Sequence, residues 1–162
     1  MEPAWDSTVE CLDPERLIER VPWLERPLVV TNGVFDVLHA GHVSCLEAAR
    51  REGGTLVVAL NSDVSARNLG KPGERPFNAL DQRARVVAAL GCVSWVTWFD
   101  ERTPAELLDA LQPDIYVKGG DYSADTLPEA AQVRSWGGRV VIVPHLDGHS
   151  STRLNEQMRD AA

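Results

Sequence analysis

The sequence has no paired cysteines and no long apolar run. Its three cysteines, Cys11, Cys45 and Cys92, are widely spaced and form no C-x-x-C pair, so neither a disulfide framework nor a cysteine zinc site is predicted. No apolar run approaches the roughly 20 residues of a membrane-spanning helix, and the first residues lack the basic and apolar regions of a signal peptide. We therefore expect a cytoplasmic protein that does not associate with membranes.

Basic residues are also in the minority. The chain has 16 Lys and Arg against 24 Asp and Glu, which gives a formal net charge of -8. This charge opposes general attraction to nucleic acid, so no nucleic-acid partner is expected, and an anionic ligand must be held by local positive groups. The 162 residues, 44% of them hydrophobic, are enough for one compact domain with a buried core.

Residues 1–26 differ in pattern from the rest of the chain. They are rich in proline and contain an amphipathic stretch, residues 14–21, in which Leu17, Ile18 and Val21 share a helical face. We interpret residues 1–26 as an N-terminal arm with one short helix. Its tryptophans, Trp5 and Trp23, are expected to pack either on the arm's own domain or on a partner subunit.

Residues 27–162 alternate short apolar runs with helical stretches. The expected strands are 28–31, 55–60, 93–99, 115–117 and 139–143; the expected helices are 43–51, 81–90, 103–111, 127–136 and one from about 151. Thr103 is expected to cap its helix through its hydroxyl. The alternation predicts an α/β fold, a Rossmann-like three-layer α/β/α domain with a five-stranded parallel sheet.

Ligands of such sheets bind beyond the carboxyl ends of the strands. The first loop, residues 31–42, enters a helix there, and amides near Gly41 at the helix start are suited to phosphate. Gly33 permits a turn with positive φ, and Gly41 allows close approach of a phosphate. His39 and His42 are placed to donate to phosphate oxygens. Fixed donors of this kind stabilise the five-coordinate state of nucleotidyl transfer without a protein nucleophile.

Histidines also bind metals, and all four, His39, His42, His145 and His149, lie in two loops expected to face each other. A zinc site needs three or four ligands and a supporting shell. Mg²⁺ carried in by a nucleotide is the better expectation, because Mg²⁺ prefers phosphate and carboxylate oxygens. The sequence therefore predicts no metal site built by the protein itself.

The later loops supply further candidates. In residues 67–78, Lys71 and Arg75 either bind the phosphate of an acceptor substrate or lie on a solvated surface loop. Arg83, on the next helix, either serves similarly or pairs with an acid. After the fourth strand, Lys118 can reach phosphate and the following glycines let the backbone approach a ligand. Ser150, Ser151 and Thr152 precede the last helix and are either phosphate ligands or an ordinary helix cap.

The run Gly33-Val34-Phe35-Asp36 followed by His39-Ala40-Gly41-His42 resembles the G-x-F-D-x-x-H-x-G-H signature of the cytidylyltransferase-like nucleotidyltransferases. Over residues 27–160, the further runs Arg75-Pro76-x-Asn78, Asp81-x-Arg83, Lys118-Gly119-Gly120-Asp121-Tyr122 and Gly148-x-Ser150-x-Thr152 are similar to the heptose 1-phosphate adenylyltransferases. This resemblance implies transfer of AMP from ATP to D-glycero-β-D-manno-heptose 1-phosphate, which gives ADP-heptose for the lipopolysaccharide core and pyrophosphate. It also implies Mg²⁺ with ATP and a homodimer.

The resemblance assigns roles residue by residue. Catalysis falls to His39, His42 and Lys118, and substrate binding to Asp36, Lys71, Arg75 and Arg83. Nucleotide binding falls to Thr31, Asn32, Gly33, Phe35, Gly41, Gly119, Asp121, Ser150, Ser151 and Thr152. The chain departs from the family pattern at Val34, where cysteine or threonine is frequent, at His149, where an aromatic or aliphatic residue is usual, and at Ser151, where threonine is usual.

Other functions remain open, among them that of other relatives such as the archaeal-type FAD synthetases. A CTP:glycerol-3-phosphate cytidylyltransferase would share the first and last loops. That family, however, carries Arg-Thr-Glu-Gly-Ile-Ser-Thr-Thr at its site, and the matching stretch of this chain starts with Pro144-His145-Leu146-Asp147. A nucleotide-binding module without catalysis should have lost some of His39, His42 and Lys118, and all three are present. A dinucleotide-dependent dehydrogenase is disfavoured because no G-x-G-x-x-G follows the first strand.

Overall fold

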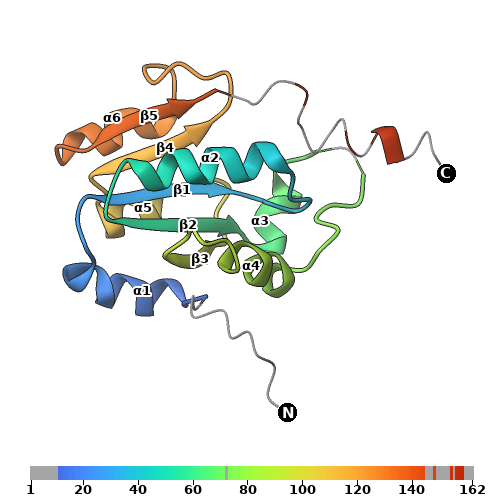
Figure 1. Cartoon of the computed structure of the whole chain (residues 1–162), viewed down its shortest axis with the longest axis horizontal. Helices are drawn as coiled ribbons and strands as arrows, with labels where there is room; N and C mark the ends of the chain where they lie inside the picture. The colour runs from blue at the N-terminus through green and yellow to red at the C-terminus, as the bar shows by residue number, and fades with distance from the viewer. Residues whose placement is uncertain (1–10, 72, 145–147, 149–153, 155, 159–162) are drawn as a thin grey trace, which may run out of the picture.

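The computed structural model describes residues 11–71, 73–144, 148, 154 and 156–158. At its centre lies a five-stranded sheet with the order β3-β2-β1-β4-β5, in which every neighbouring pair is parallel (Figure 1). The strands are β1 (Leu28–Gly33), β2 (Thr55–Asn61), β3 (Trp95–Phe99), β4 (Ile115–Gly119) and β5 (Arg139–Val143). The predicted five-stranded parallel sheet is confirmed.

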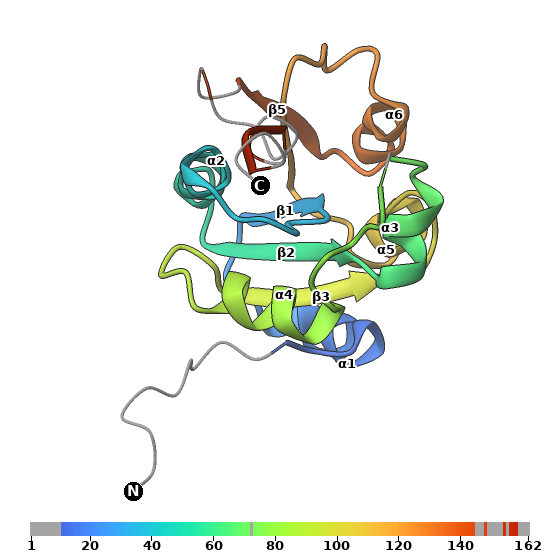
Figure 2. The same cartoon turned by 90° about the vertical axis from the view of Figure 1, so that its right-hand side faces the viewer.

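Helices cover both faces of this sheet (Figure 2). They are α1 (Pro14–Arg20), a 3-10 turn η1 (Val21–Trp23), α2 (Ala40–Arg51), α3 (Asp63–Asn68), α4 (Leu80–Ala88), α5 (Ala105–Leu111) and α6 (Pro128–Ser135). Core residues of α2 and α4 pack against one face, whereas those of α1, α5 and α6 pack against the other. This is the predicted three-layer α/β/α arrangement.

The side chains of the central strands divide between the two cores by simple alternation. In β1, Val29 faces the α2 and α4 side, whereas Leu28 and Val30 face the α1, α5 and α6 side. All seven residues of β2 are buried, as expected for a strand covered on both faces. The chain fills the β1–β2–β3 half first and then crosses to β4 beside β1, so the direction of strand addition reverses between β1 and β4.

The described part of residues 1–26 packs on the domain itself. Leu12 and Leu17 belong to the core on the α5 and α6 side, and the Leu12 N–H donates to the Val96 carbonyl at 2.8 Å. The Arg20 guanidinium lies over the Trp95 ring, 5.2 Å from its centroid. Trp23 does not share this packing, since 87% of it is exposed; Trp5 lies outside the described residues.

Local differences from the expected elements have local causes. Helix α2 begins at Ala40 rather than residue 43 because His39 is its N-cap. Helix α3 was not expected, although Ser62 caps it by accepting from the Ser65 N–H. The expected Thr103 cap is wrong: α5 begins at Ala105 after Pro104, and no side chain caps it. Residues 154 and 156–158 are helical, in agreement with a last helix.

Candidate active site

Five of the candidate residues lie at the carboxyl ends of β1 and β4, where the strand order reverses. Thr31, Asn32 and Gly33 end β1, and Lys118 and Gly119 end β4. The loop after β1 leads directly into α2, so the start of α2 lies at the same edge of the sheet (Figure 1). Ligands of doubly wound sheets bind at such a reversal, so the topology makes these residues candidates for a ligand site.

His39 and His42 cap the start of α2 reciprocally. The Gly41 N–H donates to Nδ1 of His39 at 3.1 Å, and the His39 N–H donates to Nδ1 of His42 at 3.4 Å. The two rings stack, with centroids 3.9 Å apart and an interplanar angle of 28°. The sequence predicted phosphate donors here but not that the same rings cap the helix.

This cap fixes the tautomer of both rings. A nitrogen that accepts a hydrogen bond carries no proton, so each neutral ring has its proton on Nε2. His39 and His42 are thereby set as Nε2–H donors at a helix N-terminus, where the helix dipole also favours an anion. The arrangement suits binding of a phosphate.

Phe35 and Gly33 shape the turn before the histidines. The Phe35 ring lies 5.2 Å from the His42 ring, and its backbone adopts the left-handed region at φ 49. A Cβ at Gly33 would lie 2.9 Å from the Phe35 ring. Glycine is therefore needed at position 33 because a side chain there would collide with the Phe35 ring. The positive φ that was expected at Gly33 occurs at Phe35 instead.

Lys118 shares a hydrogen-bond acceptor with Tyr116. Its Nζ lies 3.3 Å from Oδ1 of Asn32, and the Tyr116 hydroxyl donates to the same oxygen at 2.5 Å. Burial lowers the pKa of Lys118, and the nearby Glu129 carboxylate acts in the opposite direction. Burial, with Glu129 and Tyr122, raises the pKa of Tyr116, so its hydroxyl stays protonated and remains a donor at neutral pH.

Gly119 brings β4 close to α2. A Cβ at this position would lie 2.9 Å from the Sγ atom of Cys45, on the second turn of α2. Any side chain would therefore push apart the two elements that carry Lys118 and the histidine cap. Burial raises the pKa of the Cys45 thiol, which makes it a poor nucleophile.

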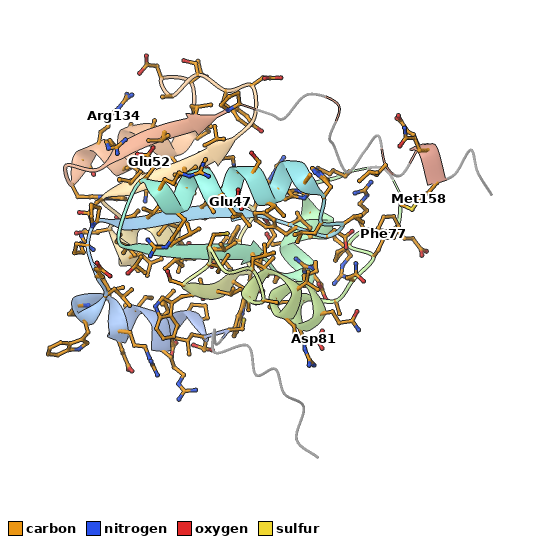
Figure 3. All side chains as sticks on the ribbon, in the orientation of Figure 1. Glu47, Glu52, Phe77, Asp81, Arg134 and Met158 are labelled. Atoms are coloured by element: carbon orange, nitrogen blue, oxygen red, sulfur yellow. The ribbon has the colours of Figure 1, made fainter. Side chains whose placement is uncertain are left out.

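Asp36 joins the first loop to residues 67–78, which are predicted to bind the acceptor substrate and are called the acceptor loop below. Its carboxylate accepts from the backbone N–H groups of Phe77 and Asn78 at 2.8 and 2.9 Å, and the Asn78 side-chain amide donates to the Asp36 carbonyl at 2.8 Å. Phe77 itself is exposed, on the side where the strands end (Figure 3). The Asp36 carboxylate therefore holds the acceptor loop in place by binding the backbone N–H groups of that loop.

Arg83 is fully buried and completes this network. Its guanidinium donates to the carbonyls of Asn78, Val34 and Asn61 at 2.8–2.9 Å and to the Asp63 carboxylate at 2.6 Å. The sequence predicted that Arg83 either binds the acceptor or pairs with an acid, and the structure favours the pairing, with Asp63. Because none of its side chain is exposed, Arg83 holds the loops in place rather than contacting a substrate.

The other predicted substrate residues lie on or near the surface. Lys71 and Asp121 are exposed and Arg75 is half-buried. The Arg75 guanidinium lies over the exposed Phe77 ring, 5.1 Å from its centroid, and its buried Nε has no hydrogen-bond partner among the described residues. The predicted phosphate ligands Ser150, Ser151 and Thr152, and also His145 and His149, lie outside the described residues.

Two residues of the site escaped the sequence reasoning, Tyr116 and Cys45. A signal existed for Tyr116, because a tyrosine within a buried apolar strand needs a partner for its hydroxyl. Among the described residues, no group of three or more His, Cys, Asp or Glu is placed to hold a metal ion. Within the same residues, no helix has the length and apolar character to cross a bilayer.

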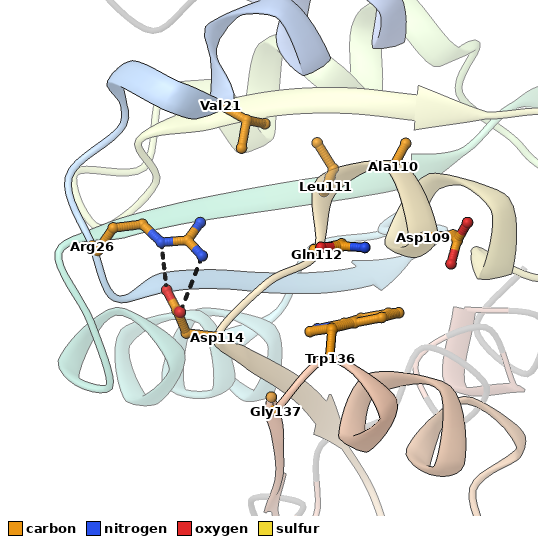
Figure 4. Close-up of a pocket in the computed structure, with 10 residues that line it drawn as sticks. Val21, Arg26, Asp109, Ala110, Leu111, Gln112, Asp114, Trp136 and Gly137 are labelled. Atoms are coloured by element: carbon orange, nitrogen blue, oxygen red, sulfur yellow. Dashed lines mark hydrogen bonds and ion pairs between the residues drawn. The ribbon is translucent and has the colours of Figure 1, made fainter.

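A cavity of about 330 Å³ lies at the opposite edge of the sheet (Figure 4). Its lining includes Arg26 and Asp114, which form an ion pair at 2.9 Å just before β1 and β4 begin. Trp136 and Gly137, before β5, also line it. Because these positions are at the amino ends of the strands, the cavity is separate from the histidine cap and Lys118.

The fold and the site together define a doubly wound α/β domain with a histidine cap at the start of its first crossover helix, an arrangement suited to phosphate. A family model described as cytidylyltransferase-like matches residues 30–157, and the chain belongs to this family. Its G-x-F-D-x-x-H-x-G-H run is the segment that forms the histidine cap.

Two relatives within this family are similar to the chain over most of its length. The chain is 57% identical over 136 residues to D-beta-D-heptose 1-phosphate adenylyltransferase from Bordetella bronchiseptica, with 84% of both chains covered. It is 51% identical over 150 residues to the bifunctional protein HldE from Streptomyces coelicolor, which covers 93% of this chain but 32% of that protein. The chain therefore spans about a third of the bifunctional relative.

Two solved structures have a similar fold. A lipopolysaccharide core biosynthesis protein from Thermoplasma volcanium matches with a TM-score of 0.60 and 30% identity, over 74% of this chain and 95% of that one. A pantoate-beta-alanine ligase from Francisella tularensis matches with a TM-score of 0.63 over 90% of this chain and 73% of that one. At 13% identity this second likeness shows the shared fold alone.

Proposed function

We propose that this protein is a nucleotidyltransferase that transfers AMP from ATP to D-glycero-β-D-manno-heptose 1-phosphate and releases pyrophosphate. The observation that carries the proposal is the 57% identity, over 84% of both chains, to a protein named for this reaction. The reciprocal histidine cap at the start of α2 supports it, because it sets two donors where phosphate binds. The product, ADP-heptose, would serve lipopolysaccharide core synthesis.

In the proposed reaction, an oxygen of the sugar phosphate attacks the α-phosphorus of ATP. A new P–O bond forms while the bond to the bridging oxygen of the β-phosphate breaks, and pyrophosphate leaves with that electron pair. His39 and His42, through Nε2–H, and the amides at the start of α2 would stabilise the charge on the five-coordinate phosphate. Lys118 would add a positive charge from β4. Catalysis of this kind needs position and electrostatics, not a protein nucleophile.

The binding residues are proposed from the family resemblance, and the structure describes all of them except Ser150, Ser151 and Thr152. Thr31, Asn32, Gly33, Phe35, Gly41, Gly119 and Asp121 would bind the nucleotide, and Ser150, Ser151 and Thr152 would bind its phosphates. Lys71 and Arg75, on the loop that Asp36 and Arg83 hold in place, would bind the acceptor. The half-buried Arg75, whose Nε has no partner among the described residues, is the stronger of these two candidates, since a buried donor needs an acceptor.

Mg²⁺ is proposed to enter with ATP. The described residues form no acidic cluster, and both carboxylate oxygens of Asp36 already accept from backbone amides. The phosphate oxygens of ATP are ligands that Mg²⁺ prefers, so they would hold the ion. Bound in this way, Mg²⁺ would neutralise part of the phosphate charge.

We also propose a homodimer, which the resemblance implies, and a cytoplasmic location, which the widely spaced cysteines favour. Light scattering coupled to size-exclusion chromatography tests the assembly: a mass of twice 17.8 kDa would support the dimer, and the mass of one chain would reject it. Fractionation of cells that express the protein tests the location.

Pyrophosphate release tests the reaction itself. Each of the four NTPs is combined with heptose 1-phosphate or glycerol 3-phosphate in the presence of Mg²⁺. Turnover with ATP and the heptose supports the proposal. Turnover with CTP and glycerol 3-phosphate would keep the chemistry but replace the substrates, and nucleotide binding without turnover across the panel would indicate a non-catalytic module.

A further inference from the structure

Tyr116 is a polar residue in the buried first part of β4. None of it is exposed, and it belongs to the core shared with Val30 of β1 and Val133 of α6. An aliphatic side chain would fill such a position, whereas a buried hydroxyl requires a partner. That partner is the side-chain oxygen of Asn32, at 2.5 Å. The hydroxyl therefore serves Asn32 rather than the packing of the core.

The donors around Asn32 fix how its carboxamide is turned. A lysine ammonium can only donate, so the amide atom 3.3 Å from Nζ of Lys118 must be the oxygen. Because that oxygen cannot donate, the Tyr116 hydroxyl must be the donor in their contact. The two lone pairs of Oδ1 are then both used. The other polar atom of the carboxamide, Nδ2, can only donate.

The three residues lie on one face of the sheet at the proposed active site. Asn32 lies two residues after Val30 in β1, and Lys118 lies two residues after Tyr116 in β4. Residues two apart in a strand share a face, so Asn32 and Lys118 lie on the α5 and α6 side with Val30 and Tyr116. Helix α2, which carries the histidine cap, covers the other side. An anionic ligand across the strand ends would therefore meet Asn32 and Lys118 from one side and the histidines from the other.

We propose that Tyr116 is a positioning residue of this site: its hydroxyl holds the Asn32 carboxamide so that Nδ2 and the Lys118 ammonium both donate to the phosphates of the bound substrates. The inference rests on the proposed nucleotidyl transfer and adds to it a residue that does not touch the substrate. Tyr116 acts only through Asn32 and through the oxygen that Asn32 shares with Lys118.

Tyr116→Phe tests the proposal because it removes only the hydroxyl and keeps the ring. We expect kcat/KM to fall about tenfold, since the two donors lose their fixed geometry. The same change in an Asn32→Ala background should alter kcat/KM by less than about twofold, because the residue through which Tyr116 acts is gone. An equal fall in both backgrounds, or no fall in the single variant, would overturn the proposal.

Thr97→Val is the matched control. Thr97 is fully buried in β3, and its hydroxyl has no hydrogen-bond partner among the described residues. Removing it tests the loss of a buried hydroxyl that orients nothing in the site. We expect kcat/KM to stay within about twofold of the unmodified protein.

A second measurement does not depend on turnover. The side-chain amide protons of Asn32, identified in an NMR spectrum by their loss in Asn32→Ala, should shift in Tyr116→Phe and stay in place in Thr97→Val. An unmoved Asn32 signal in Tyr116→Phe rejects the positioning role even if the enzyme is active. A moved signal in a protein that turns over none of the tested substrates rejects the proposed reaction while the orientation of Asn32 by Tyr116 stands.

Discussion

Replacing Arg83 with methionine should strongly destabilise the protein. Methionine keeps much of the apolar stem but removes four hydrogen bonds, three to carbonyls and one to the Asp63 carboxylate. Breaking a buried ion pair costs about 3–5 kcal/mol. The Asp63 side chain is 33% exposed and can regain water, which places the expected loss at the lower end, about 3–4 kcal/mol.

Such a loss is large against the roughly 5–15 kcal/mol of a typical domain. At about 2–4 °C per kcal/mol for a chain of this size, Tm should fall by about 6–16 °C. Urea unfolding followed by circular dichroism, with calorimetry for Tm, measures both quantities. Arg85→Met is the matched control: Arg85 is exposed on the same helix, and its loss should change stability by about 0.5 kcal/mol or less.

A loss below about 1 kcal/mol in Arg83→Met would refute the reasoning, because it would mean that the buried guanidinium contributes no more than a surface residue. The network predicts a functional effect as well. Arg83 holds the carbonyls of Val34 and Asn78, on the first loop and the acceptor loop, so KM for the acceptor should rise in any Arg83→Met protein that remains folded.

Three further predictions concern the site directly. His42→Ala should lower kcat about 100-fold or more and leave ATP affinity within a few fold, because its Nε2–H is proposed to act on the transition state; an unchanged kcat would contradict that role. Burial lowers the pKa of Lys118, so kcat/KM should decline with rising pH before an ordinary lysine would lose its proton, and this decline should be missing from the pH profile of Lys118→Arg. Gly119→Ala would place a Cβ 2.9 Å from Cys45 Sγ and should reduce kcat/KM, while Cys45→Ala in that background should restore much of it; failure of the rescue would show that the contact is not the cause.

The elements of the fold were largely predictable because their signals are local. The apolar run at 55–60 marks a strand buried on both faces, and glycines at 53 and 54 end the preceding helix. The differences are also local: the Ser62 hydroxyl caps α3, whereas the Thr103 hydroxyl, which precedes a helix in the same way, forms no cap.

The candidate site was predictable to the extent that one continuous segment builds it. Residues 33–42 carry the motif, and the structure places that segment at a helix start with His39 and His42 in contact. The sequence assigned Asp36 and Arg83 to substrate binding, whereas the partners that the structure gives them come from elsewhere in the chain. The backbone N–H groups of residues 77 and 78 donate to the Asp36 carboxylate, and the Arg83 guanidinium donates to the Asp63 carboxylate. Asp36 and Arg83 therefore hold the loops in place.

The sequence by itself determined the alternation of strands and helices, the burial of the run at 55–60 and the segment that carries the two histidines, because these signals lie in neighbouring residues. Only the tertiary structure decided the strand order β3-β2-β1-β4-β5, which puts the ends of β1 and β4 side by side. That pairing brings Lys118 to Asn32, 86 residues away, and gives Tyr116 its partner. Contacts of this kind depend on how distant segments pack together, and no local pattern of residues records them.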